Sequence, residues 1–333
     1  MFIELPIFKS FKQANVLIAG GLGFIGSNLA RQLLACGANF CVVDSLIPEY
    51  GGNLFNVDGL KGNLRINISD IRDEHSLCYL VQKQDYLFNL AGQTSHLDSM
   101  QNPYPDLDIN CKAQLKILES CRRFNPKIKI VFASTRQIYG KPGYLPVDEK
   151  HPLRPADING INKMAGESYH MLYNNVYGIR ACALRLTNTY GPRMRVKDAR
   201  QTFVGLWIRL VLEGKSFEVW GGEQLRDFTY VDDAVEALLL AALDDKANGH
   251  AFNLGGEGAV SLNTLADLLI EINEAGSYTS RRFPAERESI DIGDYYADYS
   301  RIRSELGWMP RTALADGLHR TLDFYRRHLD RYV

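Results

Sequence analysis

The sequence predicts an α/β fold with a doubly wound parallel sheet and a smaller, interleaved α/β domain. The first two-thirds of the chain alternates short runs of β-branched residues with longer stretches of helical periodicity. A glycine-rich turn stands between the first predicted strand and the first predicted helix. After about Thr187 the segments become irregular, without an internal repeat or a low-complexity tract. We therefore expect two closely packed parts around a shared cleft.

Five apolar runs are predicted to be strands, and they lie at 16–19, 40–43, 87–90, 128–133 and 181–186. Helices are expected at 24–36, which ends at Gly37, and at 110–124, which is stopped by Pro126. Two further helical patterns occur around 261–274 and 315–328. We expect residues 1–186 to form the first domain, with part of 226–255 returning to it, and 187–333 to form mainly the second.

Composition excludes several classes of protein. The 333 residues are 46% hydrophobic with a formal net charge of −1, so a globular protein without a polyanion-binding field is expected, and nucleic acid is not an expected partner. No apolar run reaches the roughly 18 residues that span a bilayer, and the first dozen residues lack a signal-peptide cleavage site. A cytoplasmic location, no membrane association and reduced core cysteines without a metal site are expected.

The glycine-rich turn predicts dinucleotide binding. Gly20, Gly23 and Gly26 form a GxxGxxG loop directly before a helix, where the backbone can approach a pyrophosphate and the helix N-terminus offers free N–H groups. The next strand ends in Asp44, whose carboxylate can accept both ribose hydroxyls and would repel a 2′-phosphate. NAD is therefore favoured over NADP. Asp70 and Ile71 follow a third strand and could hold the adenine, although Asp70 could equally be a helix N-cap.

Motifs along almost the whole chain resemble one known family. They are GGLGFIG at 20–26, NLAGQTS at 89–95, ASTRQIYG at 133–140, LRLTNTYGPR at 184–193, RDFTYVDD at 226–233 and YADYSRIRSELGW at 296–308, together with Lys163 and Glu167. The chain resembles the extended short-chain dehydrogenase/reductases, specifically the NAD-dependent nucleotide-sugar epimerases and dehydratases typified by UDP-galactose 4-epimerase. The resemblance implies a Rossmann-type fold, a UDP-sugar as the leading substrate, and a homodimer formed by helices around 110–124 and 160–176. Cell-surface polysaccharide or glycoside assembly is the usual setting of such chemistry.

The same resemblance implies roles for individual residues. Besides the glycines and acids above, it implies a cofactor site that includes Phe24, Ile25, Leu90, Ala91, Gly92, Gln93 and Lys163. Lys163 would bind the nicotinamide ribose, and the hydroxyl of Thr135 would hydrogen-bond the reacting sugar oxygen. As a plain alternative, Thr135 is a turn residue at the end of a strand.

The implied substrate contacts lie later in the chain. Asn188 and Arg226 would bind the diphosphate, although an isolated Arg226–Asp227 pair would be a surface ion pair. Backbone from Glu218 to Trp220 would line the nucleotide base, and Trp220 could equally belong to the core. Arg287 lies near the position of a second phosphate-binding arginine, but its spacing to the YAD motif is one residue too long.

One position departs from the family. Its catalytic tyrosine, four residues before the lysine, is replaced here by Asn159, and an amide cannot act as a general base. Among the replacements, His96 is the first candidate because imidazole suits proton transfer near neutral pH, although a lone histidine is more often structural. Tyr139 is expected to pack structurally, and Tyr169 does not share a helix face with Lys163.

The residues after Thr135 also bear on the reaction. Family 4,6-dehydratases carry an Asp-Glu pair there, whereas this chain has Arg136 and Gln137, so dehydration by that mechanism is disfavoured. Arg136 could bind a uronate carboxylate or pair with Glu149 or Asp148 at the surface. The sequence favours an NAD-dependent nucleotide-sugar epimerase that acts at C4 of a UDP-sugar through a keto intermediate. The alternative is a catalytically silent homologue that binds NAD and nucleotide sugars as a sensor or scaffold.

Overall fold

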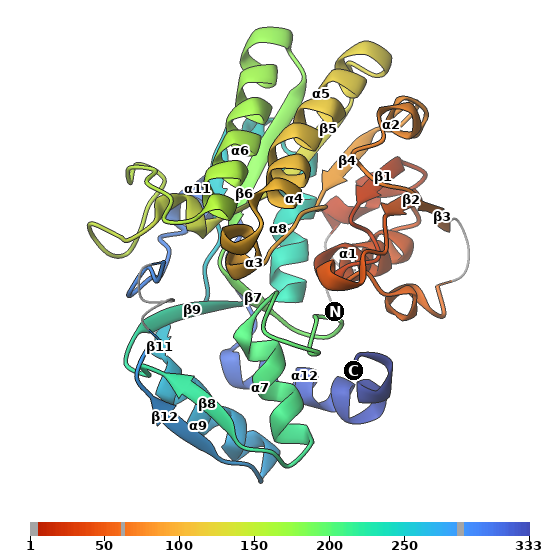
Figure 1. Cartoon of the computed structure of the whole chain (residues 1–333). Coiled ribbons are helices and arrows are strands. Elements are labelled where there is room, and N and C mark those ends of the chain that lie inside the picture. The colour runs from red at the N-terminus through yellow and green to blue at the C-terminus, as the bar shows by residue number, and fades with distance from the viewer. Residues whose placement is uncertain (1–5, 61–63, 285–289) are drawn as a thin grey trace.

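A seven-stranded parallel sheet forms the larger part of the molecule (Figure 1). The computed structural model describes residues 6–60, 64–284 and 290–333. The strand order is β10-β6-β5-β4-β1-β2-β3. The strands are β1 (Asn15–Ala19), β2 (Asn39–Asp44), β3 (Leu64–Ile68), β4 (Tyr86–Asn89), β5 (Lys129–Thr135), β6 (Arg180–Leu186) and β10 (Ala251–Asn253). The order reverses between β1 and β4, which opens a crevice at the carboxyl ends of the strands.

Helices cover both faces of this sheet, as the sequence predicts. Successive residues of β1 join different apolar clusters: Val16 and Ile18 contact the cluster that contains α1 (Phe24–Ala35) and α8 (Val231–Leu243). Leu17 and Ala19 belong to the other cluster. This second cluster is supplied by α2 (Glu74–Leu80), α5 (Ala113–Phe124) and α6 (Ile158–Tyr177). The alternation is the consequence of strand pleating, and it makes the fold doubly wound.

The smaller part of the molecule lies beyond the carboxyl ends of the sheet (Figure 1). It contains a three-stranded sheet, β11-β9-β7, and a two-stranded sheet, β12-β8. Its strands are β7 (Asn188–Tyr190), β8 (Phe217–Trp220), β9 (Leu225–Tyr230), β11 (Ala259–Ser261) and β12 (Tyr278–Arg281). Its helices are α7 (Phe203–Leu212), α9 (Leu262–Asn273) and α12 (Leu314–His328), whereas α11 (Ser300–Leu306) packs against β10 at the edge of the larger sheet.

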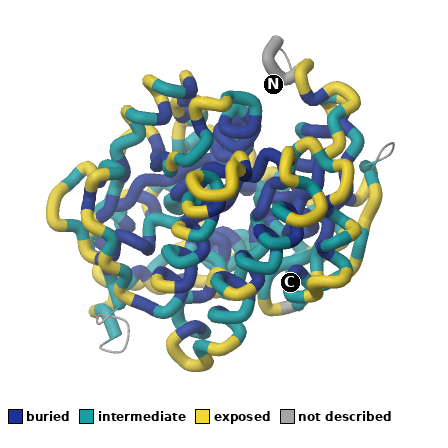
Figure 2. The backbone as a smooth tube through the Cα atoms, turned by 90° about the horizontal axis from the view of Figure 1, so that it is seen from above, coloured by how far each residue is buried: buried dark blue, intermediate teal, exposed yellow. Residues whose placement is uncertain are grey.

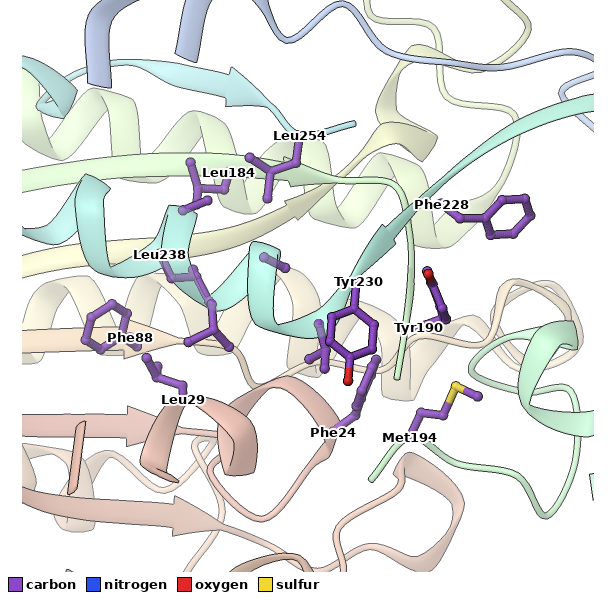
Figure 3. Close-up of a cluster of buried hydrophobic side chains, with 14 of the residues drawn as sticks. Phe24, Leu29, Phe88, Leu184, Tyr190, Met194, Phe228, Tyr230, Leu238 and Leu254 are labelled. Atoms are coloured by element: carbon purple, nitrogen blue, oxygen red, sulfur yellow. The ribbon is translucent and has the colours of Figure 1, made fainter. Parts of the chain in front are cut away.

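The two parts share one apolar core. Figure 3 shows Phe88 and Leu238, which lie between sheet and helix, in the same cluster as Tyr190 and Phe228 of the smaller part. In Figure 2 the buried backbone likewise forms a continuous interior inside an exposed rim. The expectation of close packing between the two parts is therefore correct.

Two features differ from the expectation. The segment after Thr187 is more regular than its sequence suggests, because α7 and the almost entirely buried α8 lie within it. All six cysteines are unpaired, but only Cys41, Cys121 and Cys182 are buried; the other three are partly exposed. Within residues 6–60, 64–284 and 290–333, no helix has the length and apolar character to cross a bilayer.

Candidate active site

A cavity of about 900 Å³ extends from the glycine-rich turn after β1 to the β8 strand of the smaller part. Its size is near the upper end for a small-molecule site. It brings together every predicted site residue that the structure describes. These are Gly20, Gly23, Phe24, Ile25, Gly26, Asp44, Asp70, Ile71, Leu90, Ala91, Gly92, Gln93, His96, Thr135, Asn159, Lys163, Asn188, Glu218, Trp220 and Arg226. Arg287, the remaining candidate, lies outside the described residues.

The glycine-rich turn is closed so tightly that a side chain cannot replace Gly20 or Gly26. Gly20 has a φ of +78°, and a Cβ on Gly26 would come within 2.2 Å of the carbonyl oxygen of Gly20. Gly23 caps α1 without a side-chain hydrogen bond, so the backbone N–H groups of the first turn remain available. The turn therefore fits the close approach of a pyrophosphate.

Two carboxylates line the adenosine end of the predicted cofactor site. Asp44 accepts hydrogen bonds from the backbone N–H groups of Leu22 (3.1 Å) and Leu46 (2.9 Å), while burial raises its pKa above the ordinary value. Asp70 is held by the guanidinium of Arg72, with an Nη2–Oδ2 distance of 2.6 Å. The helix N-cap alternative for Asp70 is wrong, because Asp73 caps α2. Asp44 is thus fixed at the end of β2, where a ribose can be bound.

Lys163 lines the cavity. It is buried, its Nζ donates a 3.1 Å hydrogen bond to the Ala133 carbonyl, and it lies 5.1 Å from the centre of the Phe132 ring. Burial lowers the pKa of this ammonium to about 8. The helix α6 that carries it begins at the N-cap Asp157 and ends at Gly178, which has a φ of +69°. The lysine therefore combines a fixed position with a titration near neutral pH.

Thr135 ends β5 and lines the same cavity. Its Oγ1 accepts a 3.2 Å hydrogen bond from the backbone N–H of Gln137, so it also caps the short helix that follows. The hydroxyl proton is not used by that contact, which leaves Thr135 able to donate a hydrogen bond into the cavity. Thr135 can therefore cap the short helix and donate a hydrogen bond into the cavity at the same time.

The side chain of Asn159 is engaged in a buried polar network. Its Nδ2 donates to Asp106 Oδ2 at 2.8 Å and to the Gln93 carbonyl at 2.9 Å. Asp106 is fully buried and receives its second amide donor from Asn162 at 2.8 Å. The position of the family tyrosine thus serves here as a hydrogen-bond donor to a buried carboxylate.

Of the three groups considered as the base, only His96 lines the cavity within the described part of the chain. Tyr139 is buried, donates to Asn253 Oδ1 at 2.7 Å and receives Arg185 Nη1 at 2.6 Å; burial raises its pKa to about 12. It is structural, as expected. Tyr169 lies outside the cavity and packs against the α2–α5–α6 cluster. The structure therefore retains His96 as the base candidate.

His96 begins α3 (His96–Gln101), which precedes the short α4 (Pro103–Leu107). Its Nδ1 lies 2.9 Å from Oδ2 of Asp157, which sequence reasoning missed. The contact is close but bent, because the direction of the ring N–H does not meet hydrogen-bond geometry. The 2.9 Å distance is within hydrogen-bond range, a small ring rotation straightens the contact, and catalytic hydrogen bonds often tighten only with substrate bound.

Two arginines, Arg226 and Arg136, line the end of the cavity where the diphosphate is expected. Arg226 is buried and donates to the carbonyls of Leu225 and Gly293, and its Nη2 lies 3.3 Å from Asp291. The surface-pair alternative with Asp227 is therefore wrong. Asp227 is buried, and burial raises its pKa to about 6. Burial and the charge of Arg136 lower the pKa of Arg226 to about 10.

Arg136 points toward this same end of the cavity. Its Nη2 donates to Asn188 Oδ1 at 3.1 Å, and the guanidinium lies 5.1 Å from the Tyr295 ring centre. Its Nη1 is shielded from solvent and has no hydrogen-bond partner among the described residues. Glu149 accepts instead from the Asn253 backbone, and Asp148 from Tyr144. The predicted surface pairs of Arg136 are therefore absent from the part of the chain that the structure describes.

The β8 strand closes the far end of the cavity. Trp220 is half-buried there and its ring contacts Phe283 at 6.5 Å, so the core alternative for Trp220 is wrong. Glu218 is exposed and pairs with Arg281 at 3.2 Å. An exposed strand edge with a neighbouring aromatic ring suits a stacked nucleotide base.

Comparison with known proteins agrees with this arrangement. The model of the NAD dependent epimerase/dehydratase family matches residues 16–255. A relative from Methanocaldococcus jannaschii, described as a putative UDP-glucose 4-epimerase, is 32% identical over 315 residues, covering 94% of this chain and 99% of that protein. The structure of a UDP-glucose 4-epimerase with UDP-glucose from Thermotoga maritima is 31% identical with a TM-score of 0.85, covering 95% and 99% of the two chains.

A third comparison involves a different reaction. A dTDP-glucose 4,6-dehydratase from Streptomyces venezuelae, with NAD and TYD bound, is 26% identical with a TM-score of 0.86 and covers 95% of this chain and 98% of that one. The chain belongs to the NAD dependent epimerase/dehydratase family. It is an enzyme of the nucleotide-sugar epimerases and dehydratases, with NAD as its cofactor.

Proposed function

We propose that this enzyme epimerises C4 of a UDP-sugar through a transient keto sugar. The observation that carries the proposal is the single cavity in which the glycine-rich turn, Lys163, Thr135 and Arg226 meet. Bound NAD would take a hydride from the sugar carbon and return it to the opposite face. The tight turn and the fixed Asp44 support binding of that cofactor, because they offer backbone N–H groups and a ribose acceptor.

The residues that line the cavity have different roles in binding NAD and the nucleotide sugar. Gly20, Gly23 and Gly26 hold the pyrophosphate, Lys163 holds the nicotinamide ribose, and Thr135 donates a hydrogen bond to the reacting oxygen. The further cofactor contacts are Phe24, Ile25, Asp44, Asp70, Ile71, Leu90, Ala91, Gly92 and Gln93. Arg226 and Asn188 bind the diphosphate, and the β8 backbone from Glu218 to Trp220 binds the base. Holding both reactants in one orientation supplies much of the rate advantage.

The choice of reaction rests on the residues after Thr135. Arg136 and Gln137 stand where a 4,6-dehydratase needs an acid and a base, and Gln137 is occupied with Asp157 at 3.1 Å. Names of relatives support a UDP-sugar and C4, because both the archaeal relative and the Thermotoga structure are described as UDP-glucose 4-epimerases. Nη1 of Arg136 has no hydrogen-bond partner within residues 6–60, 64–284 and 290–333, which favours a sugar with a carboxylate at C5 among those UDP-sugars.

A second candidate function is supported by one observation. Asn159 is locked to Asp106 and cannot take a proton, which is compatible with a silent protein that binds NAD and nucleotide sugars as a sensor or scaffold. Lys163 does not distinguish the two functions, because a silent protein that binds NAD would use the same ammonium. The enzyme is favoured by His96, a side chain able to accept a proton that lines the same cavity.

A substrate panel distinguishes these functions. Purified protein is incubated with UDP-glucose, UDP-N-acetylglucosamine and UDP-glucuronate, and with GDP-, CDP- and dTDP-sugars, and the products are identified by NMR. We expect a C4 epimer from at least one UDP-sugar, with UDP-glucuronate the best substrate. Tight binding of nucleotide sugars without any turnover would favour the silent alternative.

The proposal extends to the setting of the enzyme. We propose a division into an NAD-binding domain, residues 1–186 with part of 226–255, and a nucleotide-sugar domain that is mainly residues 187–333; the pairing of β10 with β6 supports the return of the chain. Exposed apolar residues on α6 support a homodimer through α5 and α6. Six unpaired cysteines support a cytoplasmic location, and the nucleotide-sugar product would serve polysaccharide biosynthesis.

A further inference from the structure

We infer that His96 and Asp157 act as a pair that moves the proton Asn159 cannot move. The inference rests on the proposed epimerase function and adds a residue, Asp157, that positions the base. Its starting point is the 2.9 Å distance between His96 Nδ1 and Asp157 Oδ2 at the edge of the cavity. Asp157 is only two residues before Asn159 and is the N-cap of the same helix. The pair thus lies next to the position from which the family tyrosine acts.

Asp157 is fixed on both of its oxygens. Its side chain is fully shielded from solvent, its Oδ1 accepts the backbone N–H of Gly160 at 2.7 Å, and its Oδ2 accepts Gln137 Nε2 at 3.1 Å. Burial alone would raise its pKa, but the contacts with His96, Gly160 and Gln137 outweigh burial, and the pKa lies below the ordinary value. A negatively charged, immobile oxygen therefore faces Nδ1 of His96.

The histidine has the complementary properties. Its side chain is 39% exposed, so the ring is reachable from the cavity while Nδ1 is turned to Asp157. When Nδ1 carries the proton shared with a carboxylate, Nε2 is the unprotonated nitrogen and can accept a proton. The carboxylate also stabilises the imidazolium that forms. Orientation by a buried carboxylate is what distinguishes a general base from a solvated histidine.

Other charges surround the pair. Asp98 lies on α3 itself and pairs with Arg200 at 3.2 Å. The neighbouring α4 carries Asp106, which is satisfied by Asn159 and Asn162. Lys163 of α6 and Arg136, which follows β5, line the same cavity, and the charge of Asp157 acts on Arg136. These groups enter any pH profile of the enzyme, so the test below compares variants with matched charges.

The proton step balances without a further reactant. The O–H bond of the sugar hydroxyl breaks, the proton passes to Nε2 of His96, and the electron pair of that bond forms the C=O double bond. NAD, when bound, would accept the hydride from the same carbon. In the return half-reaction the hydride comes back to carbon and the proton returns from Nε2 to oxygen. The rival for this role is Lys163, because burial brings the pKa of its ammonium to about 8.

The first experiment removes the imidazole. His96→Ala is compared with His75→Ala, which removes an exposed histidine from α2. We expect kcat to fall roughly 10²- to 10⁴-fold in H96A alone, with binding of UDP-sugar and NAD retained. Added imidazole should restore part of the rate, because the deleted ring leaves a gap open to the cavity.

The second experiment changes Asp157 while keeping its cap. Asparagine is an equally good N-cap, so Asp157→Asn retains the bond to Gly160 but presents an amide donor to Nδ1, which leaves the proton on Nε2. Asp73→Asn makes the same change at the N-cap of α2, away from the cavity. We expect kcat to fall about 10²-fold or more in D157N with an unchanged KM, and no change in D73N. Nitrogen NMR of the His96 ring should report the change of tautomer independently of activity.

The outcomes separate the two proposals. Active wild type with a rescued H96A and a slow D157N supports the pair. Active wild type with unchanged kcat in H96A, or with a kcat that falls only when Lys163 is replaced, overturns the pair and leaves the epimerase intact. Inactive wild type on the whole panel overturns both proposals. A D157N enzyme that retains full kcat overturns the role of Asp157.

Discussion

The role of Asn159 follows in part from its position in the sequence, and the rest depends on its contacts in the folded protein. The sequence alone predicts that an amide in the tyrosine position cannot titrate, and nothing in the structure changes that chemistry. Its actual task was not predictable, because its partner Asp106 lies 53 positions away in the chain and joins it only when α4 packs on α6. The local motif therefore predicts that residue 159 is not a general base, whereas its role as a hydrogen-bond donor to Asp106 is seen only in the folded structure.

Asn159→Ala should therefore destabilise the protein. The change removes one of the two amide donors of the buried Asp106 carboxylate, which costs about 1–3 kcal/mol of unfolding free energy. Urea denaturation measures the loss. Asn162→Ala is the control, because it removes the other donor without changing the cavity wall. Equal stability of N159A and wild type would contradict the structural role of Asn159.

Lys163 should make stability depend on pH. Its pKa is about 8 in the folded state against an ordinary 10.5, so between these values the unfolded chain binds more protons and the unfolding free energy rises with pH. Below pH 8 the buried ammonium lowers the free energy of unfolding by its full amount. Between pH 8 and pH 10.5 the folded protein has lost this proton, and the free energy of unfolding rises by about 3 kcal/mol.

Unfolding of wild type and Lys163→Met, followed from pH 7 to pH 11, measures this difference. The methionine variant has no charge to relieve, so the wild-type rise relative to K163M is the predicted signal. Parallel pH dependences of the two proteins would show that the ammonium is not buried.

At the scale of elements, the turn between β1 and α1 depends on close contact between the backbones of Gly20 and Gly26. Gly26→Ala should abolish NAD binding and destabilise the protein, because its Cβ would lie 2.2 Å from the Gly20 carbonyl oxygen. Overpacking of this kind costs about 1–3 kcal/mol. Isothermal titration with NAD and thermal unfolding test it. Gly143→Ala is the control, since the nearest atom to its Cβ would be at an ordinary 3.7 Å; NAD binding by G26A equal to that of G143A would contradict the account.

The elements themselves were unequally predictable. The five expected strands and the helix from Phe24 onward are present because continuous apolar runs and a C-terminal glycine predict them locally. The helix α8 was missed because it is buried on almost every side and so has no polar stripe to mark its period. The six-residue α3 gave too short a pattern to predict.

At the scale of the whole molecule, α6 presents an exposed apolar face. Ile161, Leu172 and Val176 project within about 60° of one another at 100° per residue, and each is about half exposed or more. Leu172→Glu should convert the proposed homodimer to a monomer, because a desolvated carboxylate would lie in the interface. Light scattering after size exclusion measures the mass, with Tyr79→Glu on α2 as the control. A monomeric wild type would remove the dimer proposal.

The cavity also belongs to this scale. Family motifs located most of its wall in advance, since the carboxyl ends of parallel strands converge by geometry. The pair of His96 and Asp157 was not predictable as a pair, because 61 positions separate the residues and either alone is unremarkable. The position of His96 directly after the NLAGQTS motif predicts that it lies near the site. No motif predicts the same for Asp157, whose position indicates only the start of a helix.

Isotope retention tests the central claim most directly. A UDP-sugar substrate identified by the panel is prepared with deuterium at C4 and converted in ordinary water, and the epimer is analysed by NMR. Because the hydride leaves C4 and returns to C4 within one active site, the account predicts a C4 epimer that keeps its deuterium and that H96A forms roughly 10²- to 10⁴-fold more slowly than wild type. A product that has exchanged its label with water, or an H96A variant as fast as wild type, would contradict the account.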